Sequence, residues 1–162
     1  MTITVRALEP SDAEAISQIQ NGPAALAGTL LLPFRSLNST RARYVEIPVH
    51  HHWLVGCVDG AVVGMLKLEM VDHPRRKHVG LLGMAVRDDM RGRGVGTAMM
   101  AAAVDLADNW LNISRIELQV WTDNEPAIRL YKRFDFVIEA THRQWGFRNG
   151  ELVDAHTMAR LR

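Results

Sequence analysis

The chain has 162 residues, which is the length of one domain and is enough to bury one substantial core, so a single domain over residues 1–162 is expected. Its net charge is only +1, so no broad field favours nucleic acid or an anionic membrane, and any anionic ligand must bind at a local site. Its apolar runs fall short of the roughly 20 residues that a membrane span needs, and residues 1–6 show no secretion signal, so a cytoplasmic protein is expected.

The first third of the chain predicts a strand, a helix and a segment that is hard to interpret. Residues 2–8 alternate and are rich in β-branched side chains, which is typical of a strand. A capping-box sequence begins at Ser11 and apolar residues follow it at helical spacing, so a helix is expected to start near Asp12. Residues 22–48 mix prolines, glycines and short apolar runs, and one or two short helices are expected there.

Three strand-like runs follow, at residues 52–59, 61–72 and 78–86. The first two are separated by Asp59 and Gly60, a strong hairpin signal. Cys57 is the one cysteine and lies in an apolar run, so we expect a buried core thiol rather than a nucleophile. The adjacent residues His50, His51 and His52 would point to alternate faces of an extended strand, so no metal site is expected.

The second half of the chain predicts two helices, at residues 94–110 and 124–134, and three strands, at residues 115–121, 136–145 and 151–161. Apolar residues recur at spacings of three and four in the longer helix. The last two strands flank Asn149 and Gly150, a second hairpin signal. Strands joined by tight hairpins pair antiparallel, which excludes a doubly wound parallel fold. We expect an α+β fold with a mixed, mostly antiparallel sheet of about seven strands and helices on both faces.

A glycine-rich loop joins the strand at residues 78–86 to the helix that follows, and it contains Arg91, Gly92, Arg93, Gly94, Val95, Gly96 and Thr97. The first turn of a helix has unpaired backbone N–H groups and a partial positive charge. Glycines let a ligand approach this backbone closely, so the loop can hold a pyrophosphate, with one arginine reaching phosphate and the other facing solvent. A simple tight turn is the alternative. The motifs of dinucleotide and nucleoside-triphosphate loops are absent.

The spacing Arg91-x-x-Gly94-x-Gly96 resembles the cofactor signature of the GNAT family of N-acetyltransferases, which lies at the start of a helix. Residues 115–136 resemble the second motif of that family, and the likeness covers residues 4–161. It implies the GNAT fold and an acetyl-CoA-dependent N-acetyltransferase. Shorter pieces resemble a bacterial branch that acetylates free amino acids or amino-acid-like compounds, at residues 108–111, 123–128 and 148–151. The implied acceptor is therefore the primary amine of a small molecule.

The resemblance also implies residue roles. The backbone of Met84, Ala85 and Val86 would pair with the pantetheine arm of coenzyme A, and the glycine loop would take the pyrophosphate. In the second motif, Asn124, Ala127 and Tyr131 have spacings of three and four, so they share one helix face. The resemblance places Asn124 at the pantetheine and Tyr131 near the thioester sulfur, where a phenol can act as general acid. A core aromatic is the alternative for Tyr131.

The acceptor side is less defined by the sequence. Candidates for the general base are Glu69, His78 and Glu117, and a water chain is the alternative. Arg75 or Arg76 could bind an acceptor carboxylate, unless their turn is simply solvated. Phe34 and Arg35 are expected to help shape the acceptor pocket.

Two other functions stay open at this point. The chain could be a catalytically silent acyl-CoA sensor or regulatory module, or it could acetylate a protein N-terminus or lysine. The presence of both Asn124 and Tyr131 favours the enzyme. Direct attack by the amine in a ternary complex is implied, so Cys57 is expected to form no covalent intermediate. A homodimer is left open.

Overall fold

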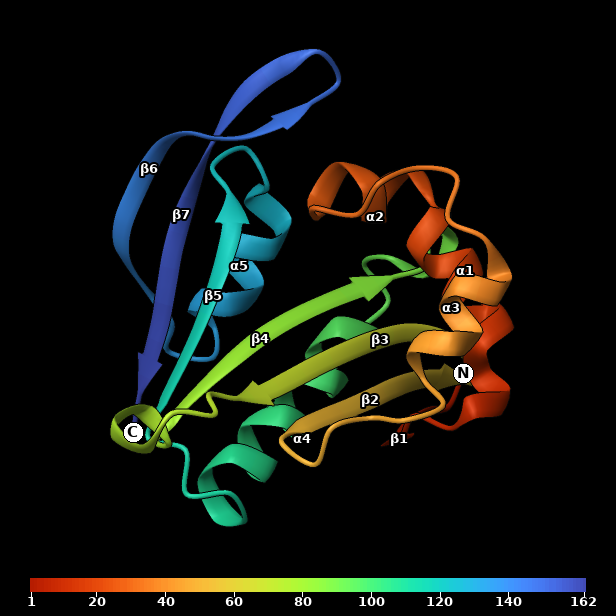
Figure 1. Cartoon of the computed structure of the whole chain (residues 1–162), viewed down its shortest axis with the longest axis horizontal. Helices are drawn as coiled ribbons and strands as arrows, with labels where there is room; N and C mark the ends of the chain where they lie inside the picture. Colours follow the sequence, from red (N-terminus) through yellow and green to blue (C-terminus); the bar gives the residue numbers. More distant parts are fainter.

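The computed structural model describes residues 1–162 and contains a seven-stranded sheet in the order β1-β2-β3-β4-β5-β7-β6 (Figure 1). Neighbouring strands pair antiparallel except β4 and β5, which run parallel. This confirms the predicted α+β class and its mixed, mostly antiparallel sheet. The strands are β1 (Ile3–Ala7), β2 (His51–Val58), β3 (Ala61–Met70), β4 (Val79–Val86), β5 (Arg115–Trp121), β6 (Val137–Arg148) and β7 (Glu151–Leu161).

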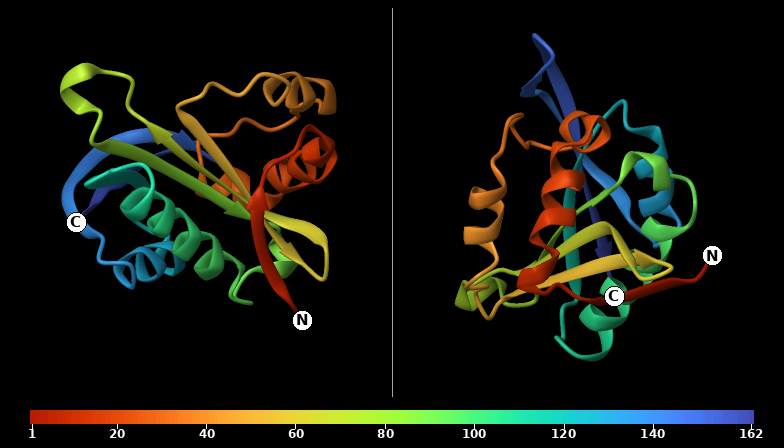
Figure 2. Two further views of the ribbon diagram at one scale, coloured as in Figure 1. Left: turned by 90° about the horizontal axis from the view of Figure 1, so that it is seen from below. Right: turned by 90° about the vertical axis from the view of Figure 1, so that its right-hand side faces the viewer.

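Helices cover both faces of the sheet, with α4 and α5 on one face and α1 to α3 on the other (Figure 2). They are α1 (Ala13–Asn21), α2 (Pro23–Gly28), α3 (Leu37–Arg43), α4 (Val95–Asn109) and α5 (Glu125–Lys132). Short 3₁₀ turns lie at Pro10–Asp12, Pro74–Arg76 and Asp88–Met90. The two short helices expected within residues 22–48 are present as α2 and α3. None of the helices combines the length and the apolarity that crossing a bilayer requires.

Alternation of side chains along β2 and β3 gives each face of the sheet its own hydrophobic core. The larger core lies under α4, where Met99 packs with Leu66. The smaller core lies under α1 and α3, where Ile16 packs with Val55. Cys57 is buried in this smaller core and unpaired, which confirms the expected core thiol.

Both predicted hairpin turns are confirmed by their backbone angles. The turn between β2 and β3 has φ values of 48° at Asp59 and 87° at Gly60. The turn between β6 and β7 has φ values of 51° at Asn149 and 81° at Gly150. Two successive left-handed residues define the turn type that matches the twist of paired strands.

The start of α1 was predicted correctly to within one residue, but the predicted cap is wrong. Ser11 lies in the 3₁₀ turn that precedes α1 and no side chain caps this helix. Asp12 instead accepts the N–H of Glu9 at 2.8 Å and pairs with both terminal nitrogens of Arg6 at 2.8 Å. The hydrogen bond from Arg6 holds the pKa of Asp12 below its ordinary value. The ion pair between Asp12 and Arg6 of β1 therefore holds the start of this helix, and no serine cap is present.

The two parallel strands of the sheet separate soon after they meet. Residues Val79–Leu81 of β4 pair with Arg115–Glu117 of β5, and beyond them the strands diverge (Figure 1). The backbone N–H and C=O groups of the odd-numbered residues in β4 form hydrogen bonds to β3. The same pattern continues just past the strand, where the N–H of Arg87 donates to the carbonyl of Val63 at 2.8 Å. Because backbone groups alternate, the N–H and C=O of Met84 and Val86 face the opening. The sheet thus contains a gap beside Met84 and Val86, where β4 has backbone groups without a partner strand.

Candidate active site

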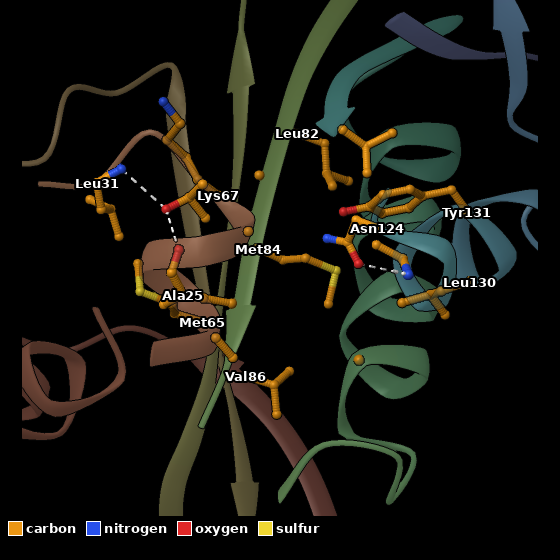
Figure 3. A pocket seen from close by; sticks show the side chains of 18 of the residues that line it. Ala25, Leu31, Met65, Lys67, Leu82, Met84, Val86, Asn124, Leu130 and Tyr131 are labelled. Atoms are coloured by element: carbon orange, nitrogen blue, oxygen red, sulfur yellow. Dashed lines mark hydrogen bonds between the residues drawn. The ribbon is translucent and has the colours of Figure 1, made fainter. Parts of the chain in front are cut away.

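A cavity of about 910 Å³ runs through the gap between β4 and β5 (Figure 3). Lys67 and Met65 lie on one side of β4, and Asn124, Leu130 and Tyr131 lie on the other side. The cavity brings together most of the residues predicted to bind the cofactor: Met84, Ala85, Val86, Arg91, Gly92, Gly94, Gly96, Thr97, Asn124, Ala127 and Tyr131. Two motifs that are far apart in the sequence therefore share one cavity.

The glycine loop forms an open cradle at one end of this cavity. Gly92 and Gly94 have φ values of 72° and 91°, in the left-handed region that favours glycine. No side chain caps α4 at Gly94, and the first bond of this helix runs from the N–H of Ala98 to the carbonyl of Gly94 at 3.0 Å. The N–H groups at the very start of α4 therefore have no partner within the helix and can bind an anion.

Two arginines bring positive charge to the cradle. Arg91 lines the cavity and Arg93 does not, although both residues are exposed, so Arg91 is the candidate for the arginine that is predicted to reach phosphate. Val95 also does not line the cavity, because its side chain is buried in the larger core. Arg133 was missed in the sequence, since only the packing of α5 against α4 brings its Nη2 to 3.3 Å from Thr97 Oγ1.

Asn124 and Tyr131 point from α5 toward β4 (Figure 3). Asn124 caps α5, because its Oδ1 accepts the N–H of Ala127 at 3.4 Å. Tyr131 is buried, and this burial raises the pKa of its phenol to about 12. The phenol therefore stays protonated at neutral pH and can donate a hydrogen bond into the cavity.

The end of the cavity on the α1–α3 face of the sheet is lined by Arg35, Arg43 and Lys67. Neither Arg35 nor Arg43 takes part in an ion pair of the protein. The Nε of Arg35 is buried and has no hydrogen-bond partner. Lys67 differs, because its Nζ donates to Glu69 Oε2 at 2.5 Å. This end of the cavity therefore offers two guanidinium groups whose charge no carboxylate of the protein balances.

The cavity is cationic although the chain as a whole is nearly neutral. Its lining has one carboxylate, that of Glu69, against the positive side chains of Arg35, Arg43, Lys67, Arg91 and Arg133. Positive groups at both ends of a cleft favour ligands with anionic groups at both ends.

Of the three candidate bases, Glu69 alone lines the cavity. Partial burial would raise the pKa of Glu69, but the hydrogen bond and the charge of Lys67 hold it below its ordinary value. Glu69 is therefore ionised at neutral pH. Glu117 pairs with Arg115 at 2.7 Å and with Arg76 at 2.9 Å, and His78 is exposed outside the cavity.

Contrary to the prediction, two residues expected to contact the acceptor lie outside the cavity. Arg76, with its neighbour Arg75, belongs to the turn between β3 and β4, at the end of the sheet where β4 is still paired to β5. Phe34 is 98% exposed and does not line the cavity, whereas Arg35 beside it does. The structure contains no group of three His, Cys, Asp or Glu side chains that could hold a metal ion, and the histidines at the start of β2 form no such group.

Solved structures share this architecture over nearly the whole chain. Spermidine N-acetyltransferase from Vibrio cholerae, in complex with CoA and spermine, is 22% identical with a TM-score of 0.89, over 98% of this chain and 95% of that one. A phosphinothricin acetyltransferase from Sinorhizobium meliloti, in complex with AcCoA, is 20% identical with a TM-score of 0.87, over 99% of this chain and 89% of that one. At these identities the likeness establishes the fold.

Sequence comparison extends the likeness from fold to function. L-amino acid N-acetyltransferase AaaT of Escherichia coli (strain K12) is 42% identical over 160 residues, covering 99% of this chain and 98% of the relative. The acetyltransferase (GNAT) family profile matches residues 27–136. The protein is thus an N-acetyltransferase that takes its acetyl group from acetyl-CoA. It belongs to the acetyltransferase (GNAT) family.

Proposed function

We propose that this enzyme acetylates the α-amino group of a free amino acid. The observation that carries the proposal is the pair Arg35 and Arg43. Both line the end of the cavity on the α1–α3 face of the sheet, which is the acceptor end in this proposal, and neither has a carboxylate partner. The α-carboxylate of an amino acid supplies the charge that they lack, and arginine is well suited to bind it. The name of the Escherichia coli relative supports the same acceptor class.

Two other acceptor classes fit the cavity less well. A polyamine such as spermidine carries several positive charges and would meet a lining in which cations outnumber Glu69. A polypeptide needs an open groove, but Arg148 ties α2 to the turn before α5, beside the cavity residues Gly28 and Asn124, by donating to the carbonyl of Ala27 at 3.0 Å and to Asp123. This arrangement favours a small anionic acceptor.

For the donor end, we propose that the cradle of residues 91–97 holds the pyrophosphate, together with Arg91 and Arg133. The cradle fits this group, because no protein atom lies within 4 Å of a Cβ built on Gly92. The unpaired backbone groups of Met84 and Val86 would bind the amides of the pantetheine arm as an added strand does. When bound, acetyl-CoA supplies the acetyl thioester.

In the proposed mechanism, each residue moves or holds one proton or charge. Glu69 receives a proton from the acceptor ammonium, directly or through water, and so raises the fraction of neutral amine. The N–H of Met84 polarises the acetyl carbonyl oxygen. Tyr131 donates its phenolic proton to the thiolate that leaves. The neutral amine attacks the carbonyl carbon directly, and the bond from that carbon to sulfur breaks. The second proton that the nitrogen loses as the amide forms passes through water to the Tyr131 phenolate, and no covalent link to the protein is needed.

Arg35→Ala is the test of the acceptor class. We expect the KM of amino acid acceptors to rise by about 10- to 100-fold, because a charged hydrogen bond contributes about 1.5–3 kcal/mol. The KM of acetyl-CoA should stay the same, and the matched variant Arg75→Ala should change neither. Steady-state assays of thiol release over an amino acid panel measure both constants. An unchanged amino acid KM in Arg35→Ala would contradict the proposed acceptor class.

Glu69→Gln tests the proposed base. We expect kcat/KM to fall by about 100-fold at neutral pH, within the range that a positioned base contributes. The loss should shrink as pH rises above the pKa of the amine, since the neutral amine then forms without help. Glu117→Gln is the control, because Glu117 is also ion-paired but lies outside the cavity. Equal losses in the two variants would remove Glu69 from the mechanism.

A further inference from the structure

Asn21, the last residue of α1, holds the backbone of Arg35 on both sides. Its Nδ2 donates to the carbonyl of Arg35 at 3.2 Å, and its Oδ1 accepts the N–H of Arg35 at 3.2 Å. The same Nδ2 also donates to the carbonyl of Ser17 at 2.9 Å, one turn earlier in α1. A backbone carbonyl accepts and a backbone N–H donates, so these partners fix which end of the Asn21 amide is oxygen.

The residue just before Arg35 adopts a conformation that its own side chain disfavours. Phe34 has a φ of 62°, which bulky residues rarely adopt. Its ring is 98% exposed, so no burial of the ring compensates for this conformation. Backbone strain of this kind persists where surrounding contacts over-determine the chain. The paired hydrogen bonds from Asn21 to the next residue are such contacts.

The strained segment delivers a cation into the cavity. Arg35 lines the acceptor end, has no carboxylate partner, and keeps its Nε buried without a hydrogen bond. Irregular chain between two short helices has no regular hydrogen-bond ladder to fix such a side chain. The position of Arg35 therefore depends on Asn21 and on the left-handed backbone of Phe34.

We propose that Asn21 is a positioning residue that sets Arg35 for the carboxylate of the acceptor. In this arrangement Phe34 contributes its backbone conformation, and its ring takes no part in acceptor binding. The inference rests on the proposed amino acid acceptor, and it adds that the specificity of the site depends on a residue that does not touch the acceptor.

Asn21→Ala is the first test, with an amino acid and its decarboxylated amine as paired acceptors. We expect the KM of the amino acid to rise by about 10-fold, since small misplacements of a binding group cost at least that much. The KM of the decarboxylated amine and of acetyl-CoA should stay unchanged, which a general structural defect would not allow. Asn38→Ala, the same substitution at an exposed residue of α3, should change none of these constants.

The double variant Asn21→Ala/Arg35→Ala should have the same amino acid KM as Arg35→Ala alone, because both substitutions remove the same contact between Arg35 and the carboxylate. If Arg35→Ala impairs amino acid binding and Asn21→Ala does not, the positioning role is overturned and the acceptor class stands. If Arg35→Ala leaves amino acid binding intact, both proposals fall.

A second variant tests the role of Phe34. Phe34→Gly keeps the left-handed backbone and removes the ring, so the amino acid KM should stay at its original value. Phe34→Val should raise that KM, because a β-branched residue is a poor occupant of this conformation. A rise in Phe34→Gly as large as that in Arg35→Ala would show that the ring itself is needed, and would overturn the backbone role.

Discussion

Gly94→Ala is expected to weaken the binding of acetyl-CoA by about 100-fold. Gly94 stands at the N-cap of α4 with a φ of 91°, and alanine there would turn the following N–H groups away from the pyrophosphate. Each hydrogen bond to a charged group contributes about 1.5–3 kcal/mol, so the loss of one or two accounts for this change. Titration calorimetry with acetyl-CoA measures the affinity directly.

Gly60→Ala is the matched control for this experiment. Gly60 has nearly the same φ, 87°, but it lies in the turn between β2 and β3 with no protein atom within 4 Å of an added Cβ. Both variants should lose a similar free energy of unfolding, about 1–2 kcal/mol, because both place alanine in the left-handed region. Only Gly94→Ala should lose affinity. Normal binding in Gly94→Ala would show that the pyrophosphate lies elsewhere.

Tyr131→Phe is expected to lower kcat by about 100-fold while the affinity for acetyl-CoA stays the same. The variant keeps the buried ring and removes the proton donor, and positioned acids contribute at least this much. Burial disfavours the charged form, so the phenol keeps its proton at every pH below its pKa of about 12. The native enzyme should therefore show no loss of kcat from Tyr131 ionisation between neutral pH and that value.

Tyr44→Phe supplies the comparison for the second experiment. Tyr44 is also buried, but it lies in the smaller core and accepts a hydrogen bond from Gln20 at 3.1 Å. Its loss should lower the free energy of unfolding and leave kcat nearly unchanged. Retention of full kcat in Tyr131→Phe across the pH range would exclude the phenol as the acid.

Most of the fold could be predicted because its determinants are local. Each hairpin turn depends on two adjacent residues, such as Asp59 with Gly60, whose left-handed preference can be read directly. The helix after the glycine loop was visible because its apolar residues recur at helical spacing over four turns. The gathering of the loop and of Tyr131 at one cavity was predicted from the family resemblance, and the structure brings them together.

The acceptor end could not be predicted in the same way. Arg35 follows an apolar run and Arg76 lies among charged residues, but neither pattern indicates which of the two arginines reaches the cavity. What separates them is the point at which β4 leaves β5, and neither periodicity nor composition encodes that point. The direction of Arg35 also depends on a side chain 14 residues earlier, that of Asn21. Arg133 was missed for the same reason, because helix packing alone brings it to Thr97.

The gap between β4 and β5 lies between a donor half of the site, which binds acetyl-CoA, and an acceptor half, which binds the amine. At Met84 and Val86 the donor half relies on main-chain groups, so any substitution there other than proline keeps those groups in place. The acceptor half depends on side chains, and the two arginines proposed to bind the acceptor carboxylate, Arg35 and Arg43, both come from residues 20–43, outside the sheet. Substitutions in that short segment can therefore change the acceptor specificity, while the residues that bind acetyl-CoA stay the same.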